Sequence, residues 1–560
     1  MLLDFTTVVR RTLVGLVWVT TLAGARQSLA TESFEAFLNS AQAINIDEPL
    51  GDPIAEPIDV EPATPQGMIE EATQDTPGNE PDLSDDEPNV EKSDSEKTNA
   101  DGEKQEEDKD ATDKGDQDKD EENSDISKLT NKIKELEKEM SSLSDSLEKV
   151  EDIASNKSIV VSGTSKSTMK ITGRIHVDAW GFDTDDNPGI NQFNGGDDPE
   201  NRLGFRRIRY AVQGKIQDNM IYKLETELSG APDVEFRDMF IGWIDLPVLG
   251  EVLLGNQKRP FGLDHLNSSR HNVFIERPFI VEAFNEDARR LGLQAYGVSD
   301  DMDWNWRYGV FNQRNIQDEV NYVGDHLQLQ LAGRLANTFW FDQTSNGRGY
   351  GHWAISGTHA DVSENAAEGS LARFRTRPEA RTESTRWLDT GTIDGAEYYN
   401  VIGFEGVVNV GAVQVVGEYQ SNWIERPGME TVHLDGGYVY LSYFLTGEFI
   451  PWDRESGTID RVVPLQNFWM VDTADGGREA GWGALQVAAR YSQADFSDQD
   501  IFGGRGEALT LAMNWFWNAN AKMQFNYITG KISNSDVGDR GADPVNGEYD
   551  IYGARFIVDF

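Results

Sequence analysis

Short segments with a two-residue period fill the chain from about residue 168 to its end. In residues 485–492 one face carries Leu, Val, Ala and Tyr, and the other carries Gln, Ala, Arg and Ser. The same alternation runs through residues 207–213 and 523–527. Successive side chains of a strand point to opposite faces, so this pattern predicts strands with one apolar and one polar face. The chain offers about 16 such segments, each near the length that a tilted strand needs to cross a bilayer.

Two features favour a transmembrane barrel with an aqueous lumen over a soluble β-sandwich or propeller. Aromatic residues gather near the segment ends, as they do in the girdles of membrane barrels; they include Trp304, Trp306, Tyr438, Trp515 and Trp517. The opposite faces carry charged and amide residues over several successive segments, whereas the inner face of a sandwich is apolar. The last segment ends on an aromatic residue, Phe560, and a terminal aromatic residue is characteristic of outer-membrane barrels. The predicted fold is all-β, an antiparallel transmembrane barrel of about 16 strands over residues 165–560.

Two different segments begin the chain. Residues 1–30 have the pattern of a secretory signal peptide, because Arg10 and Arg11 lead into the apolar run 13–19 and small residues follow. Residues 31–123 are rich in Pro, Asp, Glu, Lys and Ser and poor in aromatic and β-branched residues. Such a segment cannot bury enough apolar surface to offset its ordering entropy, so we predict a disordered acidic linker.

An apolar heptad occupies residues 124–155. One core position is taken by Ile126, Ile133, Met140, Leu147 and Ala154, and the other by Leu129, Leu136, Leu143 and Val150. This spacing predicts an α-helical coiled coil that joins identical chains. The alternative is a lone amphipathic helix on a globular surface. Ile at one core position and Leu at the other favours two chains, a preference that differs from the trimer considered below.

Composition excludes several classes of function. The formal net charge is −47, which makes nucleic acid an unlikely partner because phosphate binding needs a basic face. There is no cysteine, so disulfides, thiol nucleophiles and thiolate metal sites are excluded. The sequence has no Gly-x-Ser-x-Gly elbow, and its seven histidines lack metal-ligand spacing. We therefore predict neither an enzyme nor a bound metal or cofactor.

Four stretches resemble a known family, the phosphate-selective porins O and P. They are residues 205–209; residues 255–264 with 268–269 and 275–277; residues 443–448; and residues 482–491 with 503–504 and 511–516. The stretches span most of residues 168–560 in the family order. The resemblance implies an outer-membrane barrel, a homotrimer and passive anion passage, with the linker and coiled coil in the periplasm.

A rank of arginines is the first candidate site. Arg373, Arg375 and Arg377 alternate, so an extended chain would point all three the same way, and Arg381 and Arg386 follow. Guanidinium groups stay charged and offer planar donors that match phosphate oxygens. The run is similar to the family's arginine ladder, which leads ions to the constriction. The alternative is a solvated face of a loop.

The resemblance implies a constriction built from Arg206, Arg207, Ser268 and Arg277. Arg207 and Arg209 share the polar face of their segment, whereas Arg206 shares its parity with Ile208 and Tyr210, as a strand-end arginine at the membrane interface would. His265 stands where the family commonly has a lysine. An ordinary imidazole titrates near pH 6.5, so the charge at this position would depend on pH. Asp238 and Glu276 are candidates to orient the arginines.

These observations predict an outer-membrane porin for small anions, with phosphate or polyphosphate the leading candidates. A general or cation-preferring diffusion porin is the alternative, because the formal charge of the chain favours cations. In that alternative the N-terminal arm tethers the outer membrane to the cell wall. The expected partners are the lipid bilayer, small inorganic anions and two further copies of the chain.

Overall fold

The computed structural model describes residues 159–162, 167–183, 188–194, 198–230, 234–286, 288–316, 328–362, 372–382, 385–472, 477–536 and 544–560. The predicted signal peptide, acidic linker and coiled coil lie outside the described residues. Within the described residues, no helix is long and apolar enough to cross a membrane.

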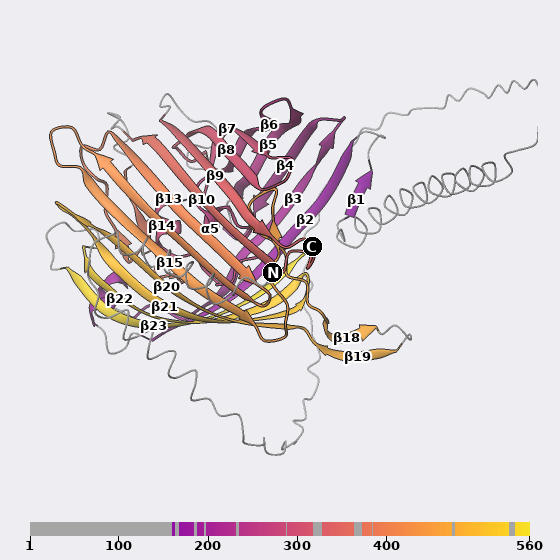
Figure 1. Ribbon diagram of the computed structural model, residues 1–560. Coiled ribbons are helices and arrows are strands. Elements are labelled where there is room, and N and C mark those ends of the chain that lie inside the picture. Colours follow the sequence, from indigo (N-terminus) through magenta and orange to yellow (C-terminus); the bar gives the residue numbers. More distant parts are fainter. Residues whose placement is uncertain are drawn as a thin grey trace, which may run out of the picture. The chain divides into compact units, whose positions relative to one another are not determined.

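A closed antiparallel β-barrel forms the body of the protein (Figure 1). Each wall strand pairs with the next along the chain, and the last strand pairs with the first, with Asp559 opposite Arg174. The sheet has 17 strands; β1 (Ile159–Ser162) only adds to the edge of the first wall strand, so 16 form the closed wall. The predicted strand number is thus confirmed. The wall consists of β2 (Thr168–Asp183), β3 (Arg202–Ile216), β4 (Met220–Glu227), β5 (Glu235–Leu246), β6 (Gly250–Lys258), β7 (Arg289–Val298), β8 (Trp304–Asn312), β9 (Leu329–Phe341), β10 (Gly349–Asp361), β13 (Tyr398–Val410), β14 (Val413–Glu425), β15 (Val432–Phe444), β20 (Ala484–Asp498), β21 (Ile501–Asn518), β22 (Ala521–Ser535) and β23 (Val545–Asp559).

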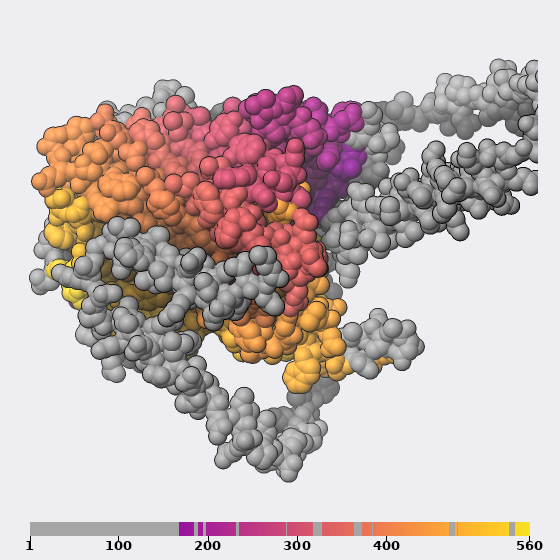
Figure 2. Space-filling view, in the orientation of Figure 1, coloured from indigo at the N-terminus to yellow at the C-terminus, as the bar shows by residue number. Residues whose placement is uncertain are grey.

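Polar residues line the inside of the wall and apolar residues its outside. In β20, Gln486 and Arg490 are each 1% exposed, whereas Val487 and Tyr491 on the other face are 37% and 38% exposed. The alternation predicted for this segment is therefore confirmed. The outer surface is continuous from β7 to β14 in the space-filling view (Figure 2).

One predicted girdle residue points the other way. Tyr438 is buried on the inner face of β15, and its hydroxyl donates to Glu418 over 3.1 Å. Its sequence neighbour Val439 and also Leu441 occupy the outer face of that strand and are exposed. The prediction for Tyr438 is wrong because a tyrosine can fill a lumen position when its hydroxyl finds a polar partner.

The two ends of the barrel differ in the length of their connections. At one end the strands are joined by residues 217–219, 247–249, 299–303, 342–348, 411–412, 445–483 and 519–520. All but one of these are short turns, and we call this the short-turn end. Long connections such as 184–201, 259–288 and 362–397 lie at the other end. Bacterial outer-membrane barrels carry their short turns on the periplasmic side.

Three connections pack against the inside of the wall. The first inner loop, residues 259–288, contains α5 (Leu263–Leu266) and α6 (Phe279–Phe284). The second inner loop, residues 362–397, contains β11 (Arg375–Thr376) and β12 (Leu388–Asp389). The inner segment, residues 445–462, contains β16 (Trp452–Asp453) and β17 (Thr458–Ile459) and enters from the short-turn end. The remaining described elements are α4 (Pro188–Asn191), a 3-10 helix η1 (Gln192–Asn194), and the hairpin strands β18 (Phe468–Asp472) and β19 (Arg478–Trp482).

An apolar core joins the inner loops to the wall. Phe284 of α6 packs edge-on against Phe374 of the second inner loop, with ring centroids 5.7 Å apart, and lies 5.7 Å from Phe496 of β20. Phe279 and Ile280 of α6 are fully buried beside them. Because this packing fixes both loops, their charged side chains hold defined positions within the barrel.

Candidate functional site

Wall side chains bind the backbone of the first inner loop. The carbonyl of Asn272 accepts from Lys522 over 2.9 Å and from Gln524 over 3.0 Å, and the carbonyl of Val273 accepts from Asn514 over 2.8 Å. The carbonyl of Ile275 accepts from Arg555, and the carbonyl of Glu276 accepts from Arg490. Donors from β20 to β23 therefore hold the loop across the lumen.

A β-bulge turns Arg206 into the lumen. His176 of β2 lies opposite Arg207 and Val177 opposite Phe205, so Arg206 is the extra residue of β3. Its guanidinium binds Glu276 of the first inner loop through Nε (2.8 Å) and Nη2 (3.2 Å). Arg206 therefore lies in the lumen, where the resemblance placed it, and not at the membrane interface, which was the alternative that uninterrupted alternation suggested.

Glu276 lies at the centre of a group of arginines. Arg555 of β23 donates to its carboxylate over 2.6 Å and also forms two 2.6 Å bonds with Asp178. Burial alone would raise the pKa of Glu276, but Arg206, Arg555 and Arg207 outweigh burial and hold that pKa well below its usual range. The carboxylate is therefore ionised, and Glu276 acts as a fixed anion inside the barrel.

Two arginines beside Glu276 have no carboxylate hydrogen bond among the described residues. Arg207 is 5% exposed, and its Nε and Nη1 atoms are buried without a hydrogen-bond partner. Arg381 of the second inner loop is close enough to Arg206 that their repulsion, together with burial, lowers the pKa of Arg381 to about 9. We call Arg206, Arg207, Arg381 and Arg555 the central arginine cluster. Buried donors without partners are what an incoming oxyanion could satisfy.

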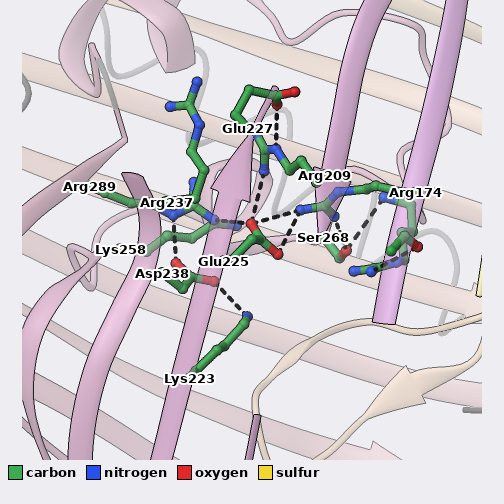
Figure 3. Close-up of polar contacts among 12 residues, drawn as sticks. Arg174, Arg209, Lys223, Glu225, Glu227, Arg237, Asp238, Lys258, Ser268 and Arg289 are labelled. Carbon is green, nitrogen blue, oxygen red and sulfur yellow. Dashed lines mark hydrogen bonds and ion pairs between the residues drawn. The ribbon is translucent and has the colours of Figure 1, made fainter. Parts of the chain in front are cut away.

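A second group of charges is joined by ion pairs (Figure 3). Glu225 accepts from Arg174 over 3.0 Å and from Arg209 over 3.3 Å, and Arg209 also binds Glu227 over 2.6 Å. Asp238 binds Arg289 over 2.5 Å and Lys223 over 2.6 Å; these groups come from strands β2 to β7. Arg209 faces the lumen, as its parity predicted, but its charge is already compensated. We call this group the paired network.

Ser268 and Arg277 both lie in the first inner loop. The Ser268 hydroxyl lies 3.5 Å from Nη1 of Arg174, at the edge of the paired network (Figure 3). Arg277 forms an ion pair of 2.9 Å with Asp264 and donates to the Asn267 carbonyl over 3.1 Å. Arg277 therefore braces the loop internally, whereas Ser268 contacts the wall, and neither side chain forms a hydrogen bond with the central arginine cluster within the described residues.

His265 does not present a titrating charge near neutral pH. It is 2% exposed, and burial together with Lys258, Arg259 and Arg277 holds its pKa well below the ordinary value. The neighbouring basic side chain is Lys258, whose Nζ donates to the carbonyls of residues 265, 266 and 267 over 2.8, 2.9 and 3.0 Å. The expectation that charge at His265 depends on pH near neutrality is therefore not met, because the burial of the ring disfavours its charged form.

The arginine run of the second inner loop is paired with acidic residues. Arg373 binds Asp389 over 2.8 Å, and Arg375 binds Glu286 over 2.8 Å. Arg377 binds Glu282 of α6 over 2.7 Å, and Arg386 lies 3.8 Å from both glutamates. Residues 375–376 are a strand, and the three alternating arginines are each bound to a carboxylate.

Several residues of the site were not predicted. Arg555, Arg490 and Asp178 lie on inner faces of wall strands, which alternation alone could have indicated. Glu379 has no such signal: it reaches from the second inner loop to Arg490 over 2.6 Å. Among the residues that the structure describes, no group of three or more His, Cys, Asp or Glu side chains is arranged to hold a metal ion.

Comparisons with known proteins show which sequences and structures the chain resembles. A family model described as phosphate-selective porin O and P matches residues 169–560. Porin O of Pseudomonas aeruginosa is 24% identical over 432 residues, which cover 70% of this chain and 90% of that protein. An uncharacterized protein of Caulobacter vibrioides is 28% identical over 367 residues, covering 64% of this chain and 68% of its own. The solved trimer form of OmpT from Vibrio cholerae superposes with a TM-score of 0.42 at 12% identity, covering 71% of this chain and 100% of that one.

Proposed function

The chain belongs to the family of phosphate-selective porins O and P, a family of outer-membrane porins, and on that premise we propose that its lumen passes small anions by passive diffusion. The observation that carries the proposal is the central arginine cluster. It joins four guanidinium groups around Glu276 and Asp178, so four positive charges meet two negative charges. The surplus favours an anion at this point, although the whole chain is acidic.

Phosphate is the leading candidate among the anions. A tetrahedral oxyanion accepts hydrogen bonds on several sides, and Arg207 has buried Nε and Nη1 donors without partners. An ion that crosses the pore must also leave it, which requires weak or multiple sites. Glu276 lies within the cluster and lowers its positive potential, so binding there would be moderate.

A general diffusion pore is the second candidate function, and the paired network favours it. Four cations, Arg174, Arg209, Lys223 and Arg289, meet three carboxylates, Glu225, Glu227 and Asp238, so the positive surplus here is smaller than in the central arginine cluster. Arg373, Arg375 and Arg377 of the second inner loop are each paired with a carboxylate. In this candidate the central arginine cluster would brace the loops without selecting ions.

Single-channel recording in planar bilayers with phosphate titrated into chloride separates the two candidates. We expect phosphate to reduce the chloride current of the wild type, and Arg207→Gln to raise the half-blocking phosphate concentration about tenfold, the loss of about one charge-assisted hydrogen bond. Arg505→Gln is the matched control, because Arg505 is an exposed arginine paired with Asp495. Equal block in wild type and Arg207→Gln would leave the general pore as the function.

We further propose that the protein is a homotrimer whose short-turn end faces the periplasm, where its N-terminal arm would contact the cell wall. The distribution of turn lengths supports this orientation. Deletion of residues 31–155 should weaken the envelope while leaving channel conductance unchanged, and mass measurement in detergent should give three copies. Loss of conductance in the deletion variant would overturn the proposal that the arm acts only as a tether to the cell wall. A mass of two copies would overturn the trimer and would agree with the preference of the predicted coiled coil for two chains.

A further inference from the structure

The connection from β15 to β20 divides into an inner and an outer half. The inner segment binds within the barrel: Trp452 is buried, and Tyr350 of β10 donates to the Ile450 carbonyl over 2.9 Å. After residue 462 the chain becomes exposed, with Val463 at 62% and Leu465 at 69%. The β18–β19 hairpin then projects from the barrel wall at the short-turn end (Figure 1).

The base of the hairpin packs on the outer face of the wall. Phe468 at the start of β18 has its ring centroid 4.6 Å from Trp515 and 5.6 Å from Trp517. The indole of Trp515 donates to the carbonyl of Trp482 over 2.8 Å. Both wall tryptophans alternate with the lumen residues Asn514 and Phe516, so they lie on the side that faces lipid.

Two tryptophans of the hairpin extend this aromatic surface and have little cover. Trp469 is 66% exposed and Trp482 is 76% exposed. Beyond Trp515 and Trp517 the surface continues to Phe556 of β23, 5.1 Å from Trp517. An exposed aromatic patch of this kind marks an interaction site, and tryptophan in particular favours the boundary between hydrocarbon and water.

We propose that Trp469 and Trp482 insert into the headgroup region of the leaflet at the short-turn end, so that a phospholipid surface is the partner of the hairpin. Continuity with the lipid-facing wall selects this partner, because Trp515 and Trp517 near the end of β21 lie at the level where a girdle meets the headgroups. The same connection forms the inner segment, so the hairpin fixes that segment to the membrane. This proposal does not depend on which ions cross the lumen.

The absence of native cysteine gives a direct test on the full chain. Trp469→Cys and Trp482→Cys are labelled with an environment-sensitive fluorophore and reconstituted into phosphatidylethanolamine–phosphatidylglycerol vesicles that contain spin-labelled lipid. Trp304→Cys, on the outer face directly after the short turn 299–303, is the lipid-facing control. Glu455→Cys, exposed on the inner segment, is the aqueous control.

We expect labels at positions 469 and 482 to show blue-shifted emission and quenching by spin-labelled lipid at least half as strong as at position 304, with little quenching at position 455. Behaviour like that of position 455 would overturn the proposal. The proposal would also be overturned if the labels at positions 469 and 482 were protected from spin-labelled lipid and these positions cross-linked two copies of the chain. That result would make the hairpin a contact between subunits. A second measurement avoids cysteine: brominated lipid should quench a smaller amount of tryptophan emission in the double variant W469F/W482F than in the wild type, and the quenching that remains comes from wall tryptophans such as Trp304, Trp515 and Trp517.

Discussion

Replacing Glu276 by glutamine should strengthen anion binding in the lumen. The change removes the fixed negative charge that Arg206 and Arg555 bind at 2.8 and 2.6 Å, while it keeps the shape of the side chain and one carbonyl acceptor. Glu276 acts electrostatically on Arg207 and would repel an anion bound there. Two unit charges separated by about 7 Å interact by about 2 kcal/mol at an effective dielectric constant near 20. That energy corresponds to roughly thirtyfold in affinity, and salt screening reduces it, so we expect a decrease of about tenfold in half-blocking phosphate concentration.

The assay is block of chloride current by phosphate in about 0.1 M salt, where the Debye length is still about 10 Å. Asp495→Asn is the matched control, since Asp495 is a partly exposed carboxylate in an ion pair with the exposed Arg505 and should leave the block unchanged. Slower electrophoretic migration after heating would show that both variants form folded barrels. An unchanged or higher half-blocking concentration in a folded Glu276→Gln channel would refute the reasoning.

Three further changes follow from individual contacts. Arg490→Met removes the guanidinium that binds the buried Glu379 at 2.6 Å. The loss should destabilise the protein by about 3–5 kcal/mol and lower the urea midpoint of unfolding. A midpoint equal to that of the wild type would contradict this prediction. Gly262→Ala places a Cβ atom 2.4 Å from Oε1 of Glu418, at a residue whose φ is +74°. We expect the start of α5 to be strained, the free energy of unfolding to fall by about 1–3 kcal/mol and the channel conductance to change. An unaltered channel would argue against the strain. Burial lowers the pKa of His271 to about 3 and that of His265 well below its ordinary value. Below about pH 6.5 the unfolded chain therefore binds more protons than the folded chain, so the free energy of unfolding should fall as pH drops from about 6.5 towards 5. The double variant H265Q/H271Q should lose part of this fall, which thermal unfolding at both pH values measures.

Alternation along single strands predicted the wall well, because each wall residue faces either lipid or lumen and the two surroundings demand different side chains. The number of strands and the inward positions of Arg207 and Arg209 followed from that rule. The inward position of Arg206 did not follow from alternation, because the β-bulge in β3 reverses the direction of this side chain and no local sequence signal marks the bulge. The prediction that Tyr438 lies in the outer aromatic girdle was also wrong, because tyrosine suits both a girdle and a hydrogen-bonded position in the lumen.

The charge balance of the site could not be predicted from the sequence. Arg375 and Arg377 bind Glu286 and Glu282, which lie about 90 residues earlier in the chain, at separations of 89 and 95. Such pairs depend on how two inner loops pack against each other within the barrel, and strand periodicity carries no information about loop packing. The sequence therefore indicated where arginines gather, and the structure decided which of them lack a carboxylate partner.

The most direct test of anion passage is the reversal potential of the wild-type channel across a potassium chloride gradient in a planar bilayer. The surplus of arginine in the central cluster predicts a reversal potential of the anion-selective sign, despite the net charge of −47 on the chain. A cation-selective sign would contradict the account and would mean that the central arginine cluster braces the inner loops without selecting the permeant ion.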